Sequence, residues 1–197
     1  LHSMLLPLCA HLKYKTESKI KIAAIITDHG ALPLWLSKNV SLLKDLNLLD
    51  ATITIGNALG GDYECVNIYT GLQLAANILN VDAIIITMGP GIMGTGTPFG
   101  FSGLELGFYL DFCITQNAKT LQIPRLSFRD LRSRHFGLSH HFLNILEYIT
   151  QNSTSIILPH MKKDKLKFVI EQLRVRGLLN NHRLSICNGH DILKSLD

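Results

Sequence analysis

Residues 20–33 read IKIAAIITDHGALP, an apolar run followed by a polar, glycine-containing connection and then a proline. The run is rich in β-branched residues and does not alternate between apolar and polar, which is typical of a strand buried on both faces of a sheet. A proline suits the first turn of a helix, so the stretch predicts a strand, a connection and a helix in succession. This βα unit indicates an α/β fold with a largely parallel sheet.

The same unit recurs along the chain. We expect strands at Ile20–Thr27, Ala51–Gly56, Asp82–Met88, Lys119–Arg125, Thr154–Leu158 and Arg183–Cys187. We expect helices at about Pro33–Leu48, Cys65–Leu79, Gly103–Gln116, Ser139–Thr150 and Lys162–Arg176, with a last piece from Asp191. The repeat predicts a Rossmann-like three-layer sandwich, with a mostly parallel sheet of about six strands and helices on both faces.

Composition favours a globular protein of the cytoplasm. Of 197 residues, 47% are hydrophobic and 17% charged, which excludes disorder and allows one α/β domain over residues 1–197. The uncharged run 83–104 holds six glycines and two prolines, so it cannot be a bilayer helix. Four scattered cysteines without a CxxC pair fit a reducing cytosol. A hydrophobic chain of this size is expected to form a homo-oligomer, with no membrane partner.

Charge is divided unevenly along the chain. Residues 1–118 carry a net charge of −3, and residues 119–197 carry +7. The basic half favours a small anionic ligand. We expect no nucleic-acid partner, because no reader motif is present and few aromatic residues interleave with the basic ones.

Residues 88–103, MGPGIMGTGTPFGFSG, form the connection with the strongest functional signal. Glycine amides before a helix can form a nest for phosphate or carboxylate. The ligand-binding candidates here are Gly89, Gly91, Gly94, Thr95, Gly96, Thr97 and Ser102. We do not expect NAD, because Pro90 lacks an amide and the next strand ends in Arg125 rather than an acid. The structural alternative is a loop that merely folds over the sheet edge.

Acidic side chains follow the first two strands. Asp28, Asp62 and Glu64 are expected to face the same crevice as the glycine-rich connection, where Mg²⁺ is a candidate cofactor or where Asp62 or Glu64 takes a proton. Gly60, Gly61 and Glu105 are expected to join this ligand-binding set. The alternative is that Asp62 or Glu64 caps the following helix.

A pair of histidines begins the fourth predicted helix. His140 and His141 are catalytic candidates, because the positive end of a helix disfavours the imidazolium and leaves a neutral base or metal ligand. Adjacent helical residues do not share a face, so we expect at most one of the two to point into the crevice. Arg134, in the preceding connection, is a candidate ligand-binding residue, and Ser139 is placed to cap the helix. No GxSxG elbow is present, so acyl transfer by a serine triad has little support.

Five stretches together resemble a bacterial family, the domain of unknown function numbered 3866. They are residues 27–34 (TDHGALPL), 60–67 (GGDYECVN), 88–97 (MGPGIMGTGT), 100–107 (GFSGLELG) and 134–141 (RHFGLSHH). The resemblance implies a longer protein with an N-terminal strand-rich region, of which this chain would be a fragment. It implies no known activity.

Two functions remain open on these residues. The first is an enzyme that acts on a small anionic or phosphorylated metabolite at the carboxyl edge of the sheet, bound by the glycine-rich connection. In this hypothesis Arg125 or Arg134 neutralises charge, and an acid or a histidine transfers a proton. The alternative is a non-catalytic module that binds a nucleotide or metabolite and regulates the rest of the protein or a partner.

Overall fold

The computed structural model describes residues 1–27, 32–89 and 91–188, and they form two compact units. Unit 1 comprises the described residues up to Met93, and unit 2 those from Gly94 onward. The expectation of one domain over residues 1–197 stays a prediction.

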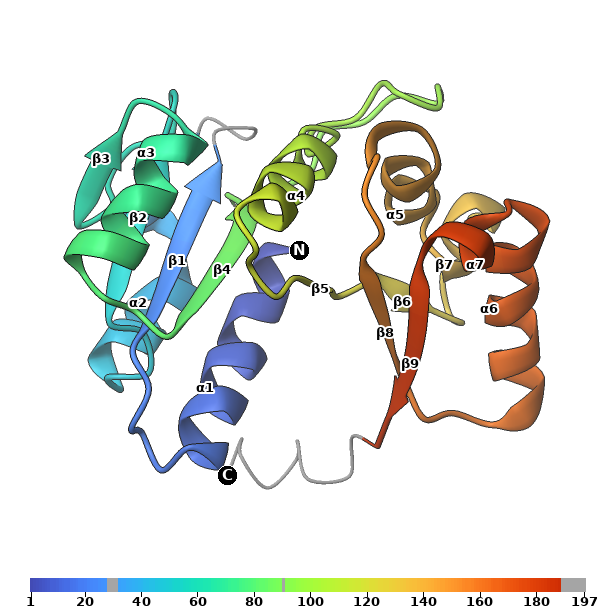
Figure 1. The fold of residues 1–197 in the computed structure, drawn as a ribbon, viewed down its shortest axis with the longest axis horizontal. Helices are drawn as coiled ribbons and strands as arrows, with labels where there is room; N and C mark the ends of the chain where they lie inside the picture. The colour runs from blue at the N-terminus through green and yellow to red at the C-terminus, as the bar shows by residue number, and fades with distance from the viewer. Residues whose placement is uncertain (28–31, 90, 189–197) are drawn as a thin grey trace. The chain divides into compact units, whose positions relative to one another are not determined.

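Unit 1 is a parallel sheet with helices on both faces (Figure 1). Its strands are β1 (Ile22–Thr27), β2 (Ala51–Ile55), β3 (Tyr63–Cys65) and β4 (Ala83–Met88), in the order β3-β2-β1-β4. Its helices are α1 (Leu5–Lys15), α2 (Lys38–Asp45) and α3 (Ile68–Gln73), with the 3₁₀ turns η1 (His2–Met4) and η2 (Leu34–Leu36) and the π-helical turn η3 (Leu74–Ile78).

The two faces of strand β1 belong to different apolar layers. Ile22, Ala24 and Ile26 share one buried cluster with residues of α1 and α2. Ile25 lies on the opposite face, where a Cβ on Gly71 of α3 would be 3.6 Å from its Cδ1. All six residues of the strand are buried, which confirms the prediction made from the uninterrupted apolar run.

Unit 2 contains two smaller sheets. Strands β5 (Leu121–Gln122), β8 (Ser155–Pro159) and β9 (Arg183–Cys187) form a parallel sheet in the order β5-β8-β9, and β6 (Leu126–Ser127) pairs antiparallel with β7 (Gly137–Leu138). Its helices are α4 (Leu106–Thr115), α5 (His140–Asn144), α6 (Lys163–Val175) and α7 (Leu178–Asn181), with the 3₁₀ turn η4 (Ser133–His135) and the π-helical turn η5 (Ile145–Ile149).

The core of unit 2 anchors the start of α5. Leu138, Phe142 and Leu146 are buried together with residues of β8 and α6. Side-chain hydrogen bonds from α6 hold strand β7, because Gln172 Oε1 accepts from the Leu138 amide at 2.9 Å and its Nε2 donates to the Phe136 carbonyl at 3.1 Å. The segment that precedes α5 is therefore held both by the buried core and by hydrogen bonds from Gln172 of α6.

The α/β class is confirmed, whereas a sheet of about six strands and the Rossmann-like layout are not. The strand expected at Lys119–Arg125 is only Leu121–Gln122. The helix expected from Pro33 begins instead at Lys38, because Ser37 caps it by accepting from the Val40 amide. The piece expected from Asp191 lies outside the described residues.

All four cysteines are free thiols. Among the helices of the described residues, none combines the length and the apolar character needed to span a bilayer. The cytoplasmic compartment and the homo-oligomer stay predictions.

Candidate functional site

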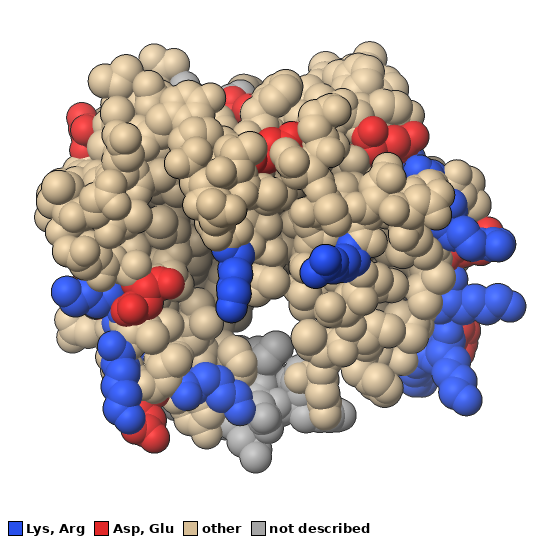
Figure 2. Space-filling model, in the orientation of Figure 1, with Lys and Arg blue, Asp and Glu red and all other residues tan. Residues whose placement is uncertain are grey.

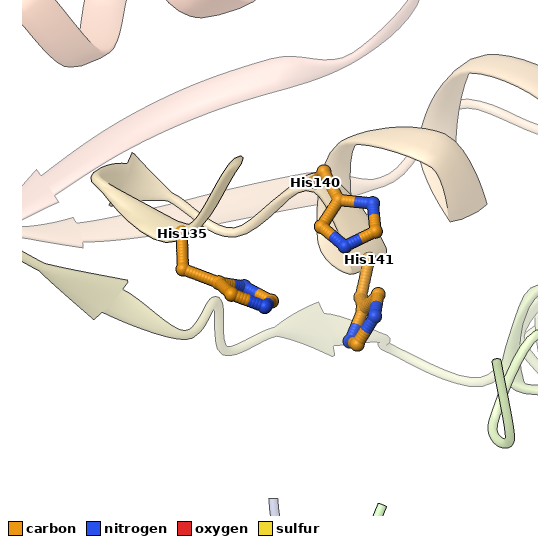
Figure 3. Close-up of side chains that lie close together, drawn as sticks. All are labelled: His135, His140 and His141. Atoms are coloured by element: carbon orange, nitrogen blue, oxygen red, sulfur yellow. The ribbon is translucent and has the colours of Figure 1, made fainter. Parts of the chain in front are cut away.

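Three histidines of unit 2 lie together, as Figure 3 shows. One ring nitrogen each from His135, His140 and His141 lies within 4.8 Å of those of the other two. The ring centroids are 4.2 Å apart for His140 and His141, 5.0 Å for His135 and His140, and 5.2 Å for His135 and His141. Among the described residues, no other three histidine, cysteine or acidic side chains lie close enough together to hold a metal ion.

Local backbone geometry brings the three rings together. His135 ends the turn η4, and after the short strand β7 the chain enters α5 at His140. His140 and His141 are the first two residues of that helix, and their rings lie close together although adjacent helical positions diverge. The expectation that at most one of the pair faces the site does not describe this cluster, which holds both.

His135 was not a candidate in the sequence analysis, although it is the most buried of the three, with 4% of its surface exposed. Its Nδ1 lies 2.9 Å from the Ser139 hydroxyl. Ser139 occupies the predicted capping position of α5, but its side chain makes no capping hydrogen bond. The serine orients a histidine instead, and the spacing HxxxSHH in residues 135–141 was the available signal.

The surroundings of the cluster keep its imidazoles uncharged. Burial lowers the pKa of His135 to about 4, helped by the nearby Arg125 and Arg132. Burial, the neighbouring histidines and the arginines lower the pKa of His141 to about 4 as well. Burial, then Arg134 and Arg176, lower the pKa of His140. All three rings can therefore offer a lone pair at neutral pH.

A hairpin formed by residues 94–101, the glycine-rich hairpin, lies beside the cluster. Gly94 and Phe101 form its antiparallel bridge, and the Phe101 ring stacks on His141 with centroids 4.1 Å apart and planes at 14°. The hairpin is fixed to the helix of the histidines, because Asn144 Nδ2 donates to the Pro98 carbonyl at 2.6 Å. It therefore positions an aromatic ring against one imidazole.

Threonine hydroxyls close this hairpin from within. The Thr95 amide donates to the Gly100 carbonyl, the Thr97 amide to Thr95 Oγ1, and the Gly100 amide to Thr97 Oγ1. These three amides are thus engaged inside the hairpin rather than displayed as an anion nest. Anion binding by the remaining glycine amides of the hairpin stays a prediction.

The other candidates from residues 88–105 are divided between the two units. Gly89 and Gly91 belong to unit 1, and Gly89 donates to the Thr27 carbonyl at 3.3 Å. Ser102 is buried in unit 2, and Glu105 holds the N-cap position of α4 rather than its first turn. Gly96 faces Arg134, whose Nη1 would lie 4.0 Å from a Cβ placed on that glycine.

Arg134 differs from the other arginines that influence the cluster. Arg125 and Arg132 both pair with Asp130, with N–O distances of 2.8 and 2.9 Å. Arg176 pairs with Glu147 at 2.5 Å. Arg134 is exposed, and its guanidinium makes no ion pair with any described residue.

Asp62 has a structural environment in unit 1. Its Oδ2 accepts from both the amide and the hydroxyl of Thr52, each at 2.8 Å, and its Oδ1 pairs with Lys44. Burial raises the pKa of Asp62, but the hydrogen bonds from Lys44 and Thr52 outweigh it and lower the pKa overall. The carboxylate thus ties the loop before β3 to strand β2 and helix α2.

Glu64, Gly60 and Gly61 form a turn beside Asp62, and a site that they share with Asp28 stays a prediction. Glu64 lies on strand β3 and accepts from the Gly60 amide at 3.0 Å. A Cβ on Gly61 would lie 2.9 Å from backbone atoms of Thr54 and Tyr63, so this turn requires glycine for packing. Neither acid caps the next helix, because Asn67 does so, with its Oδ1 accepting from the Thr70 amide. Asp28 lies outside the described residues.

Comparison with known proteins identifies the family of the chain from its sequence. No curated protein and no solved structure matches it. One family matches over residues 1–197, the whole chain, and the resemblance seen in the five stretches is thereby confirmed. The chain belongs to the family described as protein of unknown function (DUF3866).

Proposed function

We propose that the protein is an enzyme that acts on a small anionic or phosphorylated metabolite bound in unit 2, beside the three histidines. The observation that carries this proposal is the unpaired charge of Arg134. Arg125 and Arg132 share an ion pair with Asp130, and Arg176 pairs with Glu147, whereas Arg134 is exposed and has no acidic partner among the described residues.

The chemistry of arginine suggests which ligand this charge would hold. A guanidinium presents several donors in a fork that matches the paired oxygens of phosphate or carboxylate. Gly96, close to the Arg134 guanidinium, has no side chain to fill the space on that side. An anion bound there would lie on the same surface as the glycine-rich hairpin and the histidines.

The charge of unit 2 supports the same ligand class. Four exposed lysines, Lys162, Lys163, Lys165 and Lys167, lie at the start of α6. Figure 2 shows Lys and Arg side chains gathered over this helix. A field of one sign raises the local concentration of oppositely charged ligands and speeds their association.

The binding step is tested with inorganic phosphate and pyrophosphate by isothermal titration calorimetry. The variant Arg134→Gln removes the unpaired charge, and Arg129→Gln, an exposed arginine of the same connection, is the matched control. Because a hydrogen bond to a charged group contributes about 1.5–3 kcal/mol, Arg134→Gln is expected to weaken binding at least roughly tenfold. Equal binding by wild type and Arg134→Gln would contradict the proposal.

The catalytic step is tested with a panel of phosphate monoesters and sugar phosphates, by measuring released phosphate and product masses. Turnover of a panel member that is lost in Arg134→Gln and kept in Arg129→Gln supports an enzyme. Phosphate binding without turnover of any panel member would instead identify the non-catalytic binding module.

A further inference from the structure

We propose that His135, His140 and His141 form a binding site for a divalent transition-metal ion, with Zn²⁺ as the ion that suits it best. The inference deepens the proposed function by naming a cofactor for the same site. Its catalytic role rests on that function, whereas metal binding itself does not. The geometry that carries it is the convergence of three ring nitrogens within 4.8 Å (Figure 3).

The ring positions fit a tetrahedral ion. With zinc–nitrogen bonds of about 2.0–2.1 Å, two bound nitrogens are about 3.3 Å apart and two ring centroids roughly 5 Å apart. The centroids here are 4.2, 5.0 and 5.2 Å apart. The nitrogens need to approach by at most about 1.5 Å, a distance that small rotations of the rings cover.

Two nitrogens show features expected of metal ligands. His140 Nε2 is buried and has no hydrogen-bond partner, an unfavourable state that a bound metal would relieve. His135 has its Nδ1 engaged by Ser139 Oγ, so Nε2 is the nitrogen left to coordinate. Metal-bound histidines commonly use their second nitrogen in this way, since the contact fixes the ring orientation.

The donor set selects the kind of ion. Imidazole nitrogens suit zinc, copper, nickel and cobalt, whereas Mg²⁺ takes oxygen ligands. The cluster contains no carboxylate, so it does not match the Mg²⁺ expected from the acidic residues. Three protein ligands leave a fourth position for water or substrate, as in catalytic rather than structural zinc sites.

The neighbouring arginines imply coupling between metal and anion. Arg125, Arg132, Arg134 and Arg176 all act on the cluster with positive charge, which opposes the binding of a bare cation. An anion on Arg134 offsets that charge, so phosphate should raise the affinity for the metal. By linkage, the metal should raise the affinity for phosphate by the same factor.

The test uses the untagged full chain, stripped with a chelator and then titrated with Zn²⁺ and Co²⁺. The readouts are bound metal by atomic emission and the visible absorption of tetrahedral Co²⁺. We expect one ion per chain. Separate variants His140→Ala and His141→Gln should lose more affinity than the roughly 10–100-fold that loss of an outer-shell partner costs.

The matched control is His160→Ala, an exposed histidine of the same unit outside the cluster, which should bind like wild type. Circular dichroism shows which variants remain folded. His141→Gln keeps the test valid if His140→Ala unfolds, because glutamine leaves less empty space than alanine in place of a partly exposed ring. Absence of stoichiometric uptake, or uptake unchanged in every folded cluster variant, would overturn the inference.

The two proposals can fail separately. Arg134-dependent phosphate binding by the chelator-stripped protein, together with no uptake of Zn²⁺ or Co²⁺, would refute the metal site and leave the anion site. Stoichiometric uptake that depends on the cluster, with phosphate binding unchanged in Arg134→Gln, would do the reverse.

Discussion

Replacing Asp62 tests whether this carboxylate is structural or catalytic. The structure gives it two hydrogen bonds from Thr52 at 2.8 Å and an ion pair with Lys44. Bonds to a charged group contribute about 1.5–3 kcal/mol each when buried, and an exposed ion pair contributes about 0–1 kcal/mol. Because 38% of the Asp62 side chain is exposed, we discount these values and expect Asp62→Ala to destabilise unit 1 by roughly 2–3 kcal/mol.

Urea unfolding at neutral pH measures this loss. Trp35 is the only tryptophan and lies against Gly60, so its fluorescence reports on the loop that Asp62 fixes. For a unit of this size the loss corresponds to a melting temperature lower by roughly 10–15 °C. The control Asp45→Asn removes an exposed carboxylate of helix α2 and should leave the midpoint almost unchanged.

The contribution of Asp62 to the stability of the folded protein should decrease as the pH falls. The pKa of Asp62 is lower in the folded protein than its ordinary value, so the charge stabilises the folded state above that ordinary value, about 3.9. This stabilisation disappears as the pH falls through the lowered pKa. The stability difference between wild type and Asp62→Asn should therefore narrow below about pH 4. The structural role would be refuted by an Asp62→Asn variant that keeps wild-type stability at pH 7 but no longer turns over a substrate from the phosphate-ester panel.

Three further outcomes test the arrangement of unit 2. Ser139→Ala should weaken Zn²⁺ binding by roughly tenfold, because His135 loses the partner that orients it, and Ser139→Thr should restore the affinity in the same titration. Gly107→Ala should destabilise the unit by about 1–3 kcal/mol in urea unfolding, because its Cβ would lie 2.8 Å from the Cβ of Ile149. Gln172→Leu should cost about 2 kcal/mol by the same measurement, since strand β7 would lose its hydrogen bonds to α6.

The sequence predicted the longer strands of both parallel sheets. β1, β2, β4, β8 and β9 all lie within two residues of the expected ranges. Every residue of β1 and β2 is buried, and a continuous apolar run has few other stable placements. Strand β9 was also predicted, although four of its five residues are exposed. Strand β3 was missed, because it has only three residues and both Tyr63 and Glu64 are exposed. The pair β6–β7 was missed because each strand has only two residues and depends on hydrogen bonds from the distant Gln172. Such pairing leaves no periodic signal in the sequence.

The site was predictable where it depends on local chain order. His140, His141 and Arg134 lie within one short segment, and the structure brings their charges and rings together. The contribution of His135 depends on η4, on β7 and on a serine that orients a ring instead of capping its helix. The sequence could not show that Asp62 accepts from the Thr52 amide or Glu64 from the Gly60 amide, and the catalytic role of the two acids stays a prediction.

The glycines of residues 94–103 have a local structural role that the sequence analysis did not predict. We expected them to expose amides to an anion, yet the Thr95 and Thr97 hydroxyls occupy the space that a Cβ on Gly100 would need. Glycine is required at that position by the internal hydrogen bonds of the hairpin. What the hairpin offers to the site is Phe101, stacked on His141, and a gap at Gly96 beside Arg134. For a ligand bound here, we propose that the Arg134 guanidinium recognises its charge and that its reacting atoms lie against the imidazoles, beside the ring of Phe101.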